Sequence, residues 1–213
     1  MARRIGLFGG SFDPPHVGHV ALLKAALEVL HLDGALVIPT GLPVHRRLSG
    51  CATPAQRLAW MRRIFDGWPG VDVLDWEVRE ERPTPSIATL RRFVGAYPDC
   101  HPVLLLGADA FAGMDGWVEY PDHAALCDVA VFGRVACTPG EGVTAFLCET
   151  LDGWLRQPVS PGRRVDVDAG LPDISATAVR RLATQGESLR GKVPECVRHD
   201  IEQAYADAKP MAE

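Results

Sequence analysis

The 213-residue sequence lacks the patterns that mark several common protein classes. Its six cysteines include no Cys-x-x-Cys pair, which favours free thiols in a reducing cytosol over a disulfide framework. No apolar run is long enough to span a bilayer, and no secretory apolar segment or cleavage site follows the first four residues. We therefore predict a cytoplasmic protein that does not bind a membrane.

A surplus of basic residues is also absent. The chain has 22 Lys and Arg against 27 Asp and Glu, a formal net charge of −5 at pH 7. Proteins that bind a nucleic-acid backbone usually carry a basic surplus, so the composition argues against a nucleic-acid partner. A small anionic substrate needs only a local basic site. The length and the 47% hydrophobic content are ordinary for a globular protein, and we predict that residues 1–213 form a single domain.

Two well-known phosphate-binding patterns are missing as well, namely G-x-x-x-x-G-K-[ST] and G-x-G-x-x-G. The chain has instead a different glycine-rich stretch at residues 9–19, Gly-Gly-Ser-Phe-Asp-Pro-Pro-His-Val-Gly-His. An apolar segment at 5–8 precedes it and predicts a buried strand, while apolar residues at helical spacing follow it. A strand that turns through glycines into a helix brings backbone N–H groups to the positive end of the helix dipole. We therefore predict a phosphate cradle at this turn.

Two histidines stand at the start of the predicted helix. His16 and His19 are three residues apart, so both side chains can lie on one helix face and point toward a ligand of the loop. Two other interpretations are histidines that cap the helix and two ligands of a zinc site. A third histidine or a Cys-x-x-Cys pair near by would favour zinc, and neither is present.

The remaining apolar periodicity predicts an α/β fold with a Rossmann-like open parallel sheet and helices on both faces. We expect further strands at residues 35–38, 71–76, 103–106, 128–132 and 164–167. We expect further helices at residues 54–65, from 86 onward, 142–155, from 175 onward and 194–208. Residues 175–213 should form a C-terminal helical part packed on the sheet. Arg57, Arg62 and Arg63 are most simply placed on the exposed face of the 54–65 helix.

A second anion site is predicted at residues 174–180, Ile-Ser-Ala-Thr-Ala-Val-Arg. Ser175 is a good N-cap for the helix that follows. Together with Thr177 and Arg180, this helix start offers N–H groups, two hydroxyls and a guanidinium to one anion. Capping alone would explain the serine, and an arginine on a helix surface is common.

Loops after other strands carry polar residues where an open parallel sheet binds its ligand. His45 and Arg46 follow the second strand, although a solvated charged loop is an alternative. Gly107 and Asp109 follow the most apolar strand, where the carboxylate is either a helix N-cap or an acceptor from nucleoside hydroxyls. Trp117 either stacks on a flat heterocycle or lies in the core. Ser86 is the expected N-cap of the helix that begins there.

The stretch G-G-S-F-D-P-P-H-V-G-H resembles the signature of the nucleotidyltransferases that share the H-x-G-H motif, and in particular the bacterial nicotinate-nucleotide adenylyltransferases. Four further elements support this resemblance: P-V-H-R at 43–46, G-A-D at 107–109 with the downstream tryptophan, Arg134, and I-S-A-T-A-V-R at 174–180. The resemblance runs from about Ile5 to Ile201. It implies the nucleotidyltransferase fold and transfer of AMP from ATP to nicotinate mononucleotide, with Mg²⁺ entering on ATP and no resident metal.

The residues and the resemblance together assign three groups of site residues. The catalytic residues are His16, His19, Arg46 and Arg180. The residues that bind ATP and its phosphates are Gly9, Gly10, Ser11, Phe12, Gly107, Asp109, Arg134, Ser175 and Thr177. The residues that bind the acceptor nucleotide are His45, Thr84, Ser86 and Trp117. The sequence predicts a monomer or a homodimer.

The sequence departs from the family at the acceptor loop. The family commonly reads P-S-Y-T there, whereas this chain reads Pro-Ser-Ile-Ala-Thr-Leu at 85–90, without the Tyr-Thr pair. A nicotinamide mononucleotide acceptor or a phosphopantetheine-like phosphate is therefore the alternative substrate. A nucleotide-binding regulator without turnover is the alternative class, and the intact histidines and Arg180 count against it.

Overall fold

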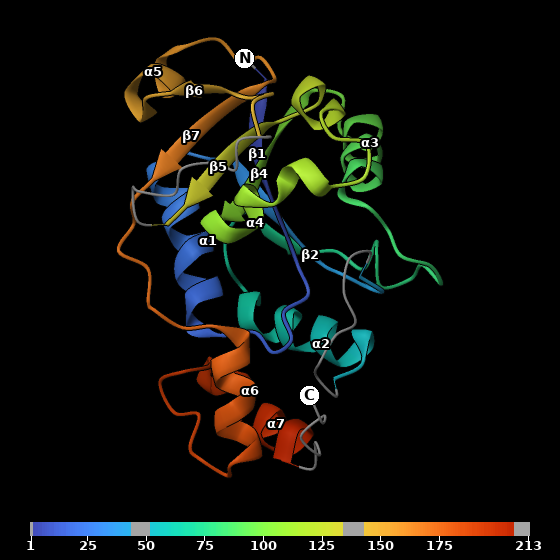
Figure 1. Ribbon diagram of the computed structural model, residues 1–213, viewed down its shortest axis with the longest axis vertical. Helices are drawn as coiled ribbons and strands as arrows, with labels where there is room; N and C mark the ends of the chain where they lie inside the picture. Colours follow the sequence, from blue (N-terminus) through green and yellow to red (C-terminus); the bar gives the residue numbers. More distant parts are fainter. Residues whose placement is uncertain (1, 44–51, 134–142, 207–213) are drawn as a thin grey trace. The chain divides into compact units, whose positions relative to one another are not determined.

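The computed structural model describes residues 2–43, 52–133 and 143–206 and contains a seven-stranded sheet with helices (Figure 1). The strands are β1 (Arg3–Gly10), β2 (Gly34–Pro39), β3 (Val71–Val73), β4 (Cys100–Gly107), β5 (Asp128–Phe132), β6 (Leu147–Glu149) and β7 (Arg163–Val167). The helices are α1 (Val17–Val29), α2 (Pro54–Phe65), α3 (Ser86–Ala96), α4 (Ala108–Ala112), α5 (Leu151–Arg156), α6 (Ala176–Thr184), α7 (Glu195–Ala206) and the short 3₁₀ helices η1 (Met114–Gly116) and η2 (Asp122–Ala125).

The strand order β3-β2-β1-β4-β5-β7-β6 and the parallel pairing confirm the predicted α/β class with an open parallel sheet. All residues of β2 and β5 are buried, as are the central residues of β1 and β4. Strands of a parallel sheet are covered on both faces, which is why their sequences read as continuous apolar runs. No helix in the described ranges is long and apolar enough to cross a membrane.

The chain divides into two compact units, which are described one at a time. The first unit comprises Met1–Gly9, Leu22–Leu36 and Pro85–Leu171. The second unit comprises Gly10–Ala21, Val37–Thr84 and Pro172–Glu213. The single domain predicted for residues 1–213 stays a prediction.

In the first unit, the carboxyl ends of three strands lie side by side. Gly107 of β4 pairs with Phe132 of β5, which in turn pairs with Val167 of β7. The turn after β5 is close to the start of α4, because a Cβ added to Gly133 would lie 2.9 Å from the Cβ of Ala108. This edge therefore brings the backbone after β4 close to the backbone after β5.

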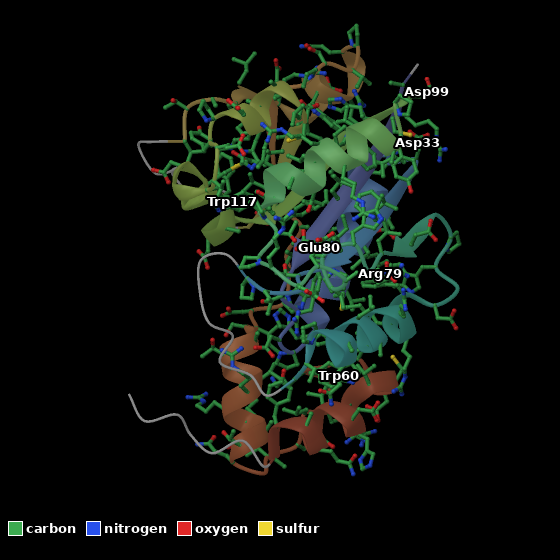
Figure 2. The ribbon with its side chains drawn as sticks, turned by 90° about the vertical axis from the view of Figure 1, so that its right-hand side faces the viewer. Asp33, Trp60, Arg79, Glu80, Asp99 and Trp117 are labelled. Atoms are coloured by element: carbon green, nitrogen blue, oxygen red, sulfur yellow. The ribbon has the colours of Figure 1, made fainter. Side chains whose placement is uncertain are left out.

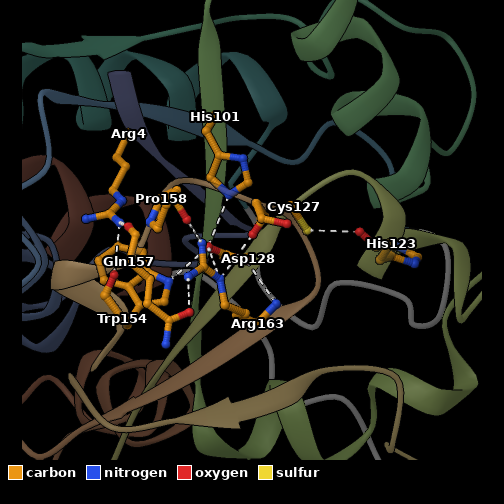
Figure 3. A network of polar contacts seen from close by, with 10 residues as sticks. Arg4, His101, His123, Cys127, Asp128, Trp154, Gln157, Pro158 and Arg163 are labelled. Atoms are coloured by element: carbon orange, nitrogen blue, oxygen red, sulfur yellow. Dashed lines mark hydrogen bonds and ion pairs between the residues drawn. The ribbon is translucent and has the colours of Figure 1, made fainter. Parts of the chain in front are cut away.

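At the amino ends of the same strands, a buried carboxylate organises a polar cluster, which we call the Asp128 cluster (Figure 3). Asp128 accepts hydrogen bonds from the indole Nε1 of Trp154 and the main-chain N–H of Arg163, both at 2.9 Å, and His101 Nε2 lies 3.1 Å from it. The Arg163 guanidinium donates to the Pro158 carbonyl at 2.7 Å and to that of Ser160 at 3.1 Å. The cluster joins strands β4, β5 and β7 to the segment after α5.

In the second unit, α7 contacts both α6 and α2 (Figure 1). Trp60 lies on the side of α2 that faces α7 (Figure 2), with its ring 6.3 Å from the ring of Tyr205. The α2 helix begins as predicted, because Thr53 accepts from the Gln56 N–H while the Gln56 side chain accepts from the Thr53 N–H. Helix α7 therefore packs against both α2 and α6 in this unit.

Three predicted elements differ from the structure. The expected strand 71–76 ends at Val73, and a turn at residues 76–79 follows. Asp75, just before this turn, pairs with Arg62 and Arg79. The expected helix at 142–155 is wrong over much of its length, since strand β6 and the cap residue Thr150 precede the short helix α5. The expected strand 103–106 is longer and runs from Cys100 to Gly107, because Cys100 and His101 also pair with β1.

Candidate active site

In the turn after β1, Phe12 has an unusual backbone conformation, and Gly10 leaves room for its ring. Phe12 adopts a positive φ of 47°, and its ring is buried with 2% exposure. A bulky residue at positive φ is a conformational outlier, which persists only where the surroundings fix it. The ring folds back over Gly10, where an added Cβ would lie 3.1 Å from the tip of the Phe12 ring. The glycine therefore makes room for the aromatic side chain that closes the loop.

Two arginines fix the carbonyl groups of this loop. Arg57 donates from Nη1 to the Ser11 carbonyl at 2.5 Å and from Nη2 to the Gly41 carbonyl at 3.0 Å. Arg180 donates from Nη1 to the Asp13 carbonyl at 2.6 Å. In a trans peptide the C=O and N–H groups point in opposite directions, so the Phe12 N–H points away from Arg57. The arginines thus orient the loop by its main chain.

The side chain of Asp13 is held from the C-terminal helix. Its carboxylate accepts a hydrogen bond from the Tyr205 hydroxyl, and both side chains are buried. Burial, together with the adjoining carboxylate, raises the pKa of Tyr205 above its ordinary value of 10.0. The phenol therefore stays protonated and serves as a permanent donor to the loop.

The prediction for Arg57 was wrong, because this side chain is fully buried and not part of the exposed face of α2. Its two partners come from loops after different strands, and a main-chain bond from the Thr40 N–H to the Gly10 carbonyl at 2.9 Å joins the same loops. The sequence does contain a signal. Arg57 precedes the buried residues Met61 and Ile64 at helical spacing, so the periodicity places it on the core face.

The two histidines at the start of α1 are stacked. Their ring centroids are 3.6 Å apart at an interplanar angle of 23°. The Nδ1 atom of His19 accepts the main-chain N–H of His16 at 3.1 Å. A ring nitrogen that accepts carries no proton, so neutral His19 bears its proton on Nε2. The predicted common face of the two histidines is confirmed.

Both histidines are neutral at physiological pH. Burial lowers the pKa of His16 to about 4. Burial and the adjacent His16 ring lower the pKa of His19 well below its ordinary value of 6.5. Two charged imidazolium rings in this stack would repel each other. The two histidines are therefore neutral N–H donors and not permanent cations.

Glycine at position 18 allows this stack to form. A Cβ added there would lie 3.0 Å from His16 Nδ1 and 3.2 Å from Cγ2 of Ile174. Contacts this short force a neighbour to move, so a side chain at this position would displace the His16 ring or the residue before α6. The small residue between the two histidines is thus a geometric requirement of the site.

The start of α6 meets the loop, as the two predicted anion sites would require. Ser175 is the N-cap, as predicted, and accepts the Ala178 N–H at 3.2 Å. Arg180 donates from Nη2 to the Thr177 hydroxyl at 3.0 Å while its Nη1 bonds the Asp13 carbonyl. The structure therefore brings Ser175, Thr177 and Arg180 together with the His16 loop in the second unit.

In the first unit, the predicted nucleoside residues follow β4. Gly107 is the N-cap of α4, and Asp109 is exposed in the first turn of that helix, so Asp109 is not the N-cap. Trp117 directly follows η1 (Figure 2) and is half-buried, which excludes the alternative of a core tryptophan. Its ring is edge-on to His123 at 5.8 Å. These side chains are accessible to a ligand of this unit.

The predicted cap at Ser86 was wrong. Pro85 is the N-cap of α3 and Ser86 is the first helical residue, with Thr84 half-buried in the extended segment before it. The hydroxyl of Ser86 contacts Nε2 of His123 at 2.9 Å, so its partner is a side chain and not the helix backbone. Nothing in the sequence around His123 indicates this contact, because it joins residues 37 positions apart.

Three predicted site residues, His45, Arg46 and Arg134, lie outside the described residues. Sequence reasoning missed Arg57, Tyr205 and His123. The sequence could have indicated that Tyr205 is buried, because it lies four residues after Ile201 and eight after Val197, which is the spacing of one helix face.

The cytidylyltransferase-like family model matches residues 7–182. Curated relatives named probable nicotinate-nucleotide adenylyltransferase include a Thermotoga maritima protein, 32% identical over 206 residues, which make up 95% of this chain and 92% of the relative. A Gemmatimonas aurantiaca relative of the same name is 34% identical over 196 residues, covering 91% of this chain and 87% of the relative.

Solved structures show the same fold. Plasmodium falciparum nicotinic acid mononucleotide adenylyltransferase complexed with NaAD superposes with a TM-score of 0.71 at 13% identity, covering 96% of this chain and all of that chain. With the curated relatives at 32–34% identity over more than nine-tenths of its length, this chain belongs to the nicotinate-nucleotide adenylyltransferase family, within the cytidylyltransferase-like group.

Proposed function

We propose that this chain transfers the adenylyl group of ATP to nicotinate mononucleotide, giving deamido-NAD and pyrophosphate. The observation that carries the proposal is the loop at residues 10–19. It carries two stacked, neutral histidines, and Arg57 of α2, Arg180 of α6 and Tyr205 of α7 hold its Ser11 and Asp13. Family membership supports the same reaction.

In this reaction an oxygen of the acceptor phosphate attacks the α-phosphorus of ATP. The bond between that phosphorus and the bridging oxygen to the β-phosphate breaks, and pyrophosphate leaves. The attacking phosphate is already ionised near pH 7, so no general base is needed. Catalysis then consists of aligning two anions and stabilising the charge that develops on the phosphates.

The roles of the residues in the second unit follow from this chemistry. His19 donates its Nε2 proton to a phosphate oxygen, and His16 supports it from the stacked position. The N-terminus of α6, with Thr177 and the guanidinium of Arg180, binds phosphate of ATP. Gly10, Ser11 and Phe12 form the cradle in this unit, and Arg46 adds positive charge. Gly9, assigned to the ATP phosphates as well, belongs to the first unit.

The roles in the first unit concern the nucleosides. We assign Gly107 and Asp109 to the ATP nucleoside, with the exposed carboxylate accepting from hydroxyls, and Arg134 to its phosphates. In this unit Trp117 stacks on the acceptor base and Ser86 is assigned to the acceptor nucleotide. Thr84 and His45, also assigned to the acceptor nucleotide, belong to the second unit. The half-buried position of Trp117 supports this assignment.

Mg²⁺ enters as part of the ATP substrate. Within residues 2–43, 52–133 and 143–206, no group of three or more His, Cys, Asp and Glu side chains is arranged to hold a metal ion. In this proposal the triphosphate supplies ligands of Mg²⁺. A cytoplasmic location and a monomeric or homodimeric state remain predictions of the sequence.

The test is pyrophosphate release by the purified protein with ATP and Mg²⁺, with nicotinate mononucleotide and nicotinamide mononucleotide in parallel reactions. We expect release with a strong preference for the acid. A preference for the amide would contradict the acceptor, and no release with either would contradict the reaction and favour a phosphopantetheine-like acceptor or a nucleotide-binding regulator.

A further inference from the structure

A cavity at the amino end of β1 belongs to the first unit and contains none of the residues assigned to the proposed reaction. Its volume is about 620 Å³, and its wall comes from the start of β1, the turn after α1 and the segment around the end of α5. The polar residues of the wall are Arg3, Arg4, His31, Asp33, Arg156 and Gln157. The loop at residues 10–19 follows the opposite end of β1 and belongs to the second unit, so this cavity is not part of the phosphate cradle.

The guanidinium of Arg4 is held in a fixed position in this wall (Figure 3). Its Nη2 atom donates to the Trp154 carbonyl at 2.9 Å and to the Gln157 carbonyl at 3.2 Å. The guanidinium carbon lies 4.1 Å from the centroid of the buried Trp154 ring, which adds a cation–π contact. The Nη1 atom has no hydrogen-bond partner among the described residues. The protein therefore orients this cation and leaves the Nη1 donors unused.

Positive charge exceeds negative charge in the wall of the cavity, although the whole chain has a formal net charge of −5. Three arginines line the cavity beside one carboxylate, that of Asp33. Asp33 is already engaged, because its Oδ2 atom accepts the main-chain N–H of Arg4 at 2.8 Å. Arg3 and Arg156 are exposed, and Arg156 pairs with the exposed Asp152 at 2.9 Å. An exposed pair of this kind contributes little, so it does not prevent Arg156 from binding another anion.

The charges around Arg4 favour an anion beside it. Burial, and then the positive charge of Arg163, lower the pKa of Arg4. The carboxylates of Asp128 and Asp33 act in the opposite direction but do not reverse this change in pKa. A negative charge in the cavity would offset the repulsion between the two guanidinium groups.

The donors of the cavity match a phosphate group. A guanidinium presents its N–H groups as a planar fork that fits the oxygens of a carboxylate or a phosphate. Phosphate has more acceptor oxygens and a larger charge than a carboxylate, so it can bind more than one arginine at a time. The side chain of Gln157 adds a donor, because its oxygen accepts from Arg163 at 3.3 Å and its NH₂ group remains. A volume of about 620 Å³ also leaves room for the organic part of a small molecule.

We propose that this cavity is a second anion-binding site, which binds a small molecule that carries one or more phosphate groups. Arg4 is the fixed donor, and the exposed side chains of Arg3 and Arg156 contact the same phosphate group or its neighbour. The site does not depend on the adenylyl transfer proposed above, so either proposal can fail without the other.

The test is a titration of the purified protein with inorganic pyrophosphate, without Mg²⁺ and at constant ionic strength, followed by the backbone amide signals in NMR spectra. The amides of residues 3–4, 31–33 and 155–157 measure binding in the cavity, and those of residues 10–19 measure binding in the cradle. We expect saturable shifts at the cavity amides, with a Kd of their own. Shifts confined to residues 10–19, or cavity shifts that sodium chloride reproduces at the same ionic strength, would overturn the proposal.

Variants at the exposed wall positions test the charge of the site. Arg3→Gln and Arg156→Gln should each raise the Kd of the cavity about 3- to 10-fold and leave the Kd of the cradle unchanged. Asp33→Asn removes the negative charge but keeps an oxygen for the Arg4 N–H, and it should lower the Kd of the cavity about 3-fold. The matched control Arg190→Gln, at an exposed position of the second unit, should change neither Kd. An unchanged cavity Kd in both Arg3→Gln and Arg156→Gln would overturn the proposal.

Two further measurements test the oriented donor and the ligand class. Arg4→Lys keeps the positive charge but not the planar fork, and it should raise the Kd of the cavity about 10-fold. An unchanged Kd would contradict the role of Arg4. Acetate, which carries a single charge, should bind the cavity of the wild type at least about 10-fold more weakly than pyrophosphate. Equal affinities for the two anions would contradict a phosphate site.

Discussion

The loop at residues 10–19 and the Asp128 cluster both bury polar side chains, and in both an arginine guanidinium donates to main-chain carbonyls, but the cluster is centred on a carboxylate. Arg57 and Arg180 donate to main-chain carbonyls of the loop. Arg163, in the Asp128 cluster, donates to carbonyls while its own main-chain N–H and the Trp154 indole bind the carboxylate of Asp128. The loop is oriented by its backbone, whereas the cluster is centred on a charged side chain.

This difference helps to distinguish a ligand-binding site from a buried polar network that stabilises the fold. In the Asp128 cluster each carboxylate oxygen has a donor from the protein, and Asp128 has no exposed surface. Nδ1 of His16 in the loop and Nε2 of His101 beside Asp128 both lack a hydrogen-bond partner in the part of the chain described here, so the difference lies in what each region orients. Buried polar groups that are fully paired stabilise a fold, and donors that are oriented by other groups are suited to a ligand.

The largest effect on stability should come from the Asp128 cluster. Asp128→Ala removes the acceptor of two hydrogen bonds and leaves the main-chain N–H of Arg163 and the indole N–H of Trp154 without it. Loss of one member of a buried charged network costs about 3–5 kcal/mol of unfolding free energy. Chemical denaturation measures this cost, and kcat of the folded protein should remain near that of the wild type.

The control for this prediction is Asp152→Ala, which removes an exposed ion pair with Arg156 at 2.9 Å. An exposed pair contributes about 1 kcal/mol or less. Equal losses of stability in the two variants would contradict the structural role of the Asp128 cluster.

The largest effect on catalysis should come from His19. His19→Ala removes one preorganised donor, and kcat should fall about 10²- to 10³-fold, equivalent to about 2.7–4 kcal/mol. Steady-state kinetics with ATP and nicotinate mononucleotide measures the effect. The exposed His199 on α7 provides a matched His→Ala control that should retain full turnover. Near-normal turnover in folded His19→Ala protein would exclude the assigned role.

Substitution of Arg57 should lower both the stability of the fold and the rate of catalysis, because Arg57 joins the loop at residues 10–19 to the core of its unit. Arg57→Met leaves the carbonyls of Ser11 and Gly41 without their donors. Such buried unpaired groups cost about 1–3 kcal/mol, and we expect a loss of about 2 kcal/mol of unfolding free energy together with a lower kcat/KM for ATP. Arg57→Lys should recover part of kcat/KM. A variant that loses stability but keeps kcat/KM would show that Arg57 does not orient the loop.

The smallest effect is the pH dependence of stability contributed by His16. Its pKa is about 4 in the folded protein and 6.5 by its ordinary value, so the unfolded chain takes up the proton first as the pH falls. The stability from neutral His16 is fully present above about pH 6.5 and is lost as the pH falls toward 4. Between pH 7 and 5 the wild type should lose about 1–2 kcal/mol more than His16→Gln. Parallel pH curves for the two proteins would contradict the lowered pKa.

The sequence predicted an element well where the residues that form its contacts lie close together in the chain. The cap of α2 lies within residues 53–56 and that of α6 within 175–178, so both could be predicted from spacing. Strand β5 was predicted with its correct bounds, because all five residues are apolar or at the strand edge. The segment before α5 was not predicted correctly, because strand β6 forms by pairing with the later strand β7, and its own sequence does not indicate that pairing.

Contacts between distant segments were beyond the sequence. The motifs predicted His16, His19 and the start of α6 as site residues, and the structure brings these together. The donors that hold the loop come from α2 and α7, whose periodicity shows burial but not the partner. The contact between Ser86 and His123 likewise depends on the placement of η2 beside α3.

A competition experiment tests the central claim most directly. The wild type and His19→Ala are each incubated with ATP, Mg²⁺ and equal amounts of nicotinate and nicotinamide mononucleotide, and the dinucleotide products are identified by mass. The account predicts that the wild type forms mainly deamido-NAD and that His19→Ala forms little of it. The amide product in excess, no dinucleotide from the wild type, or equal product from the two proteins would contradict the account.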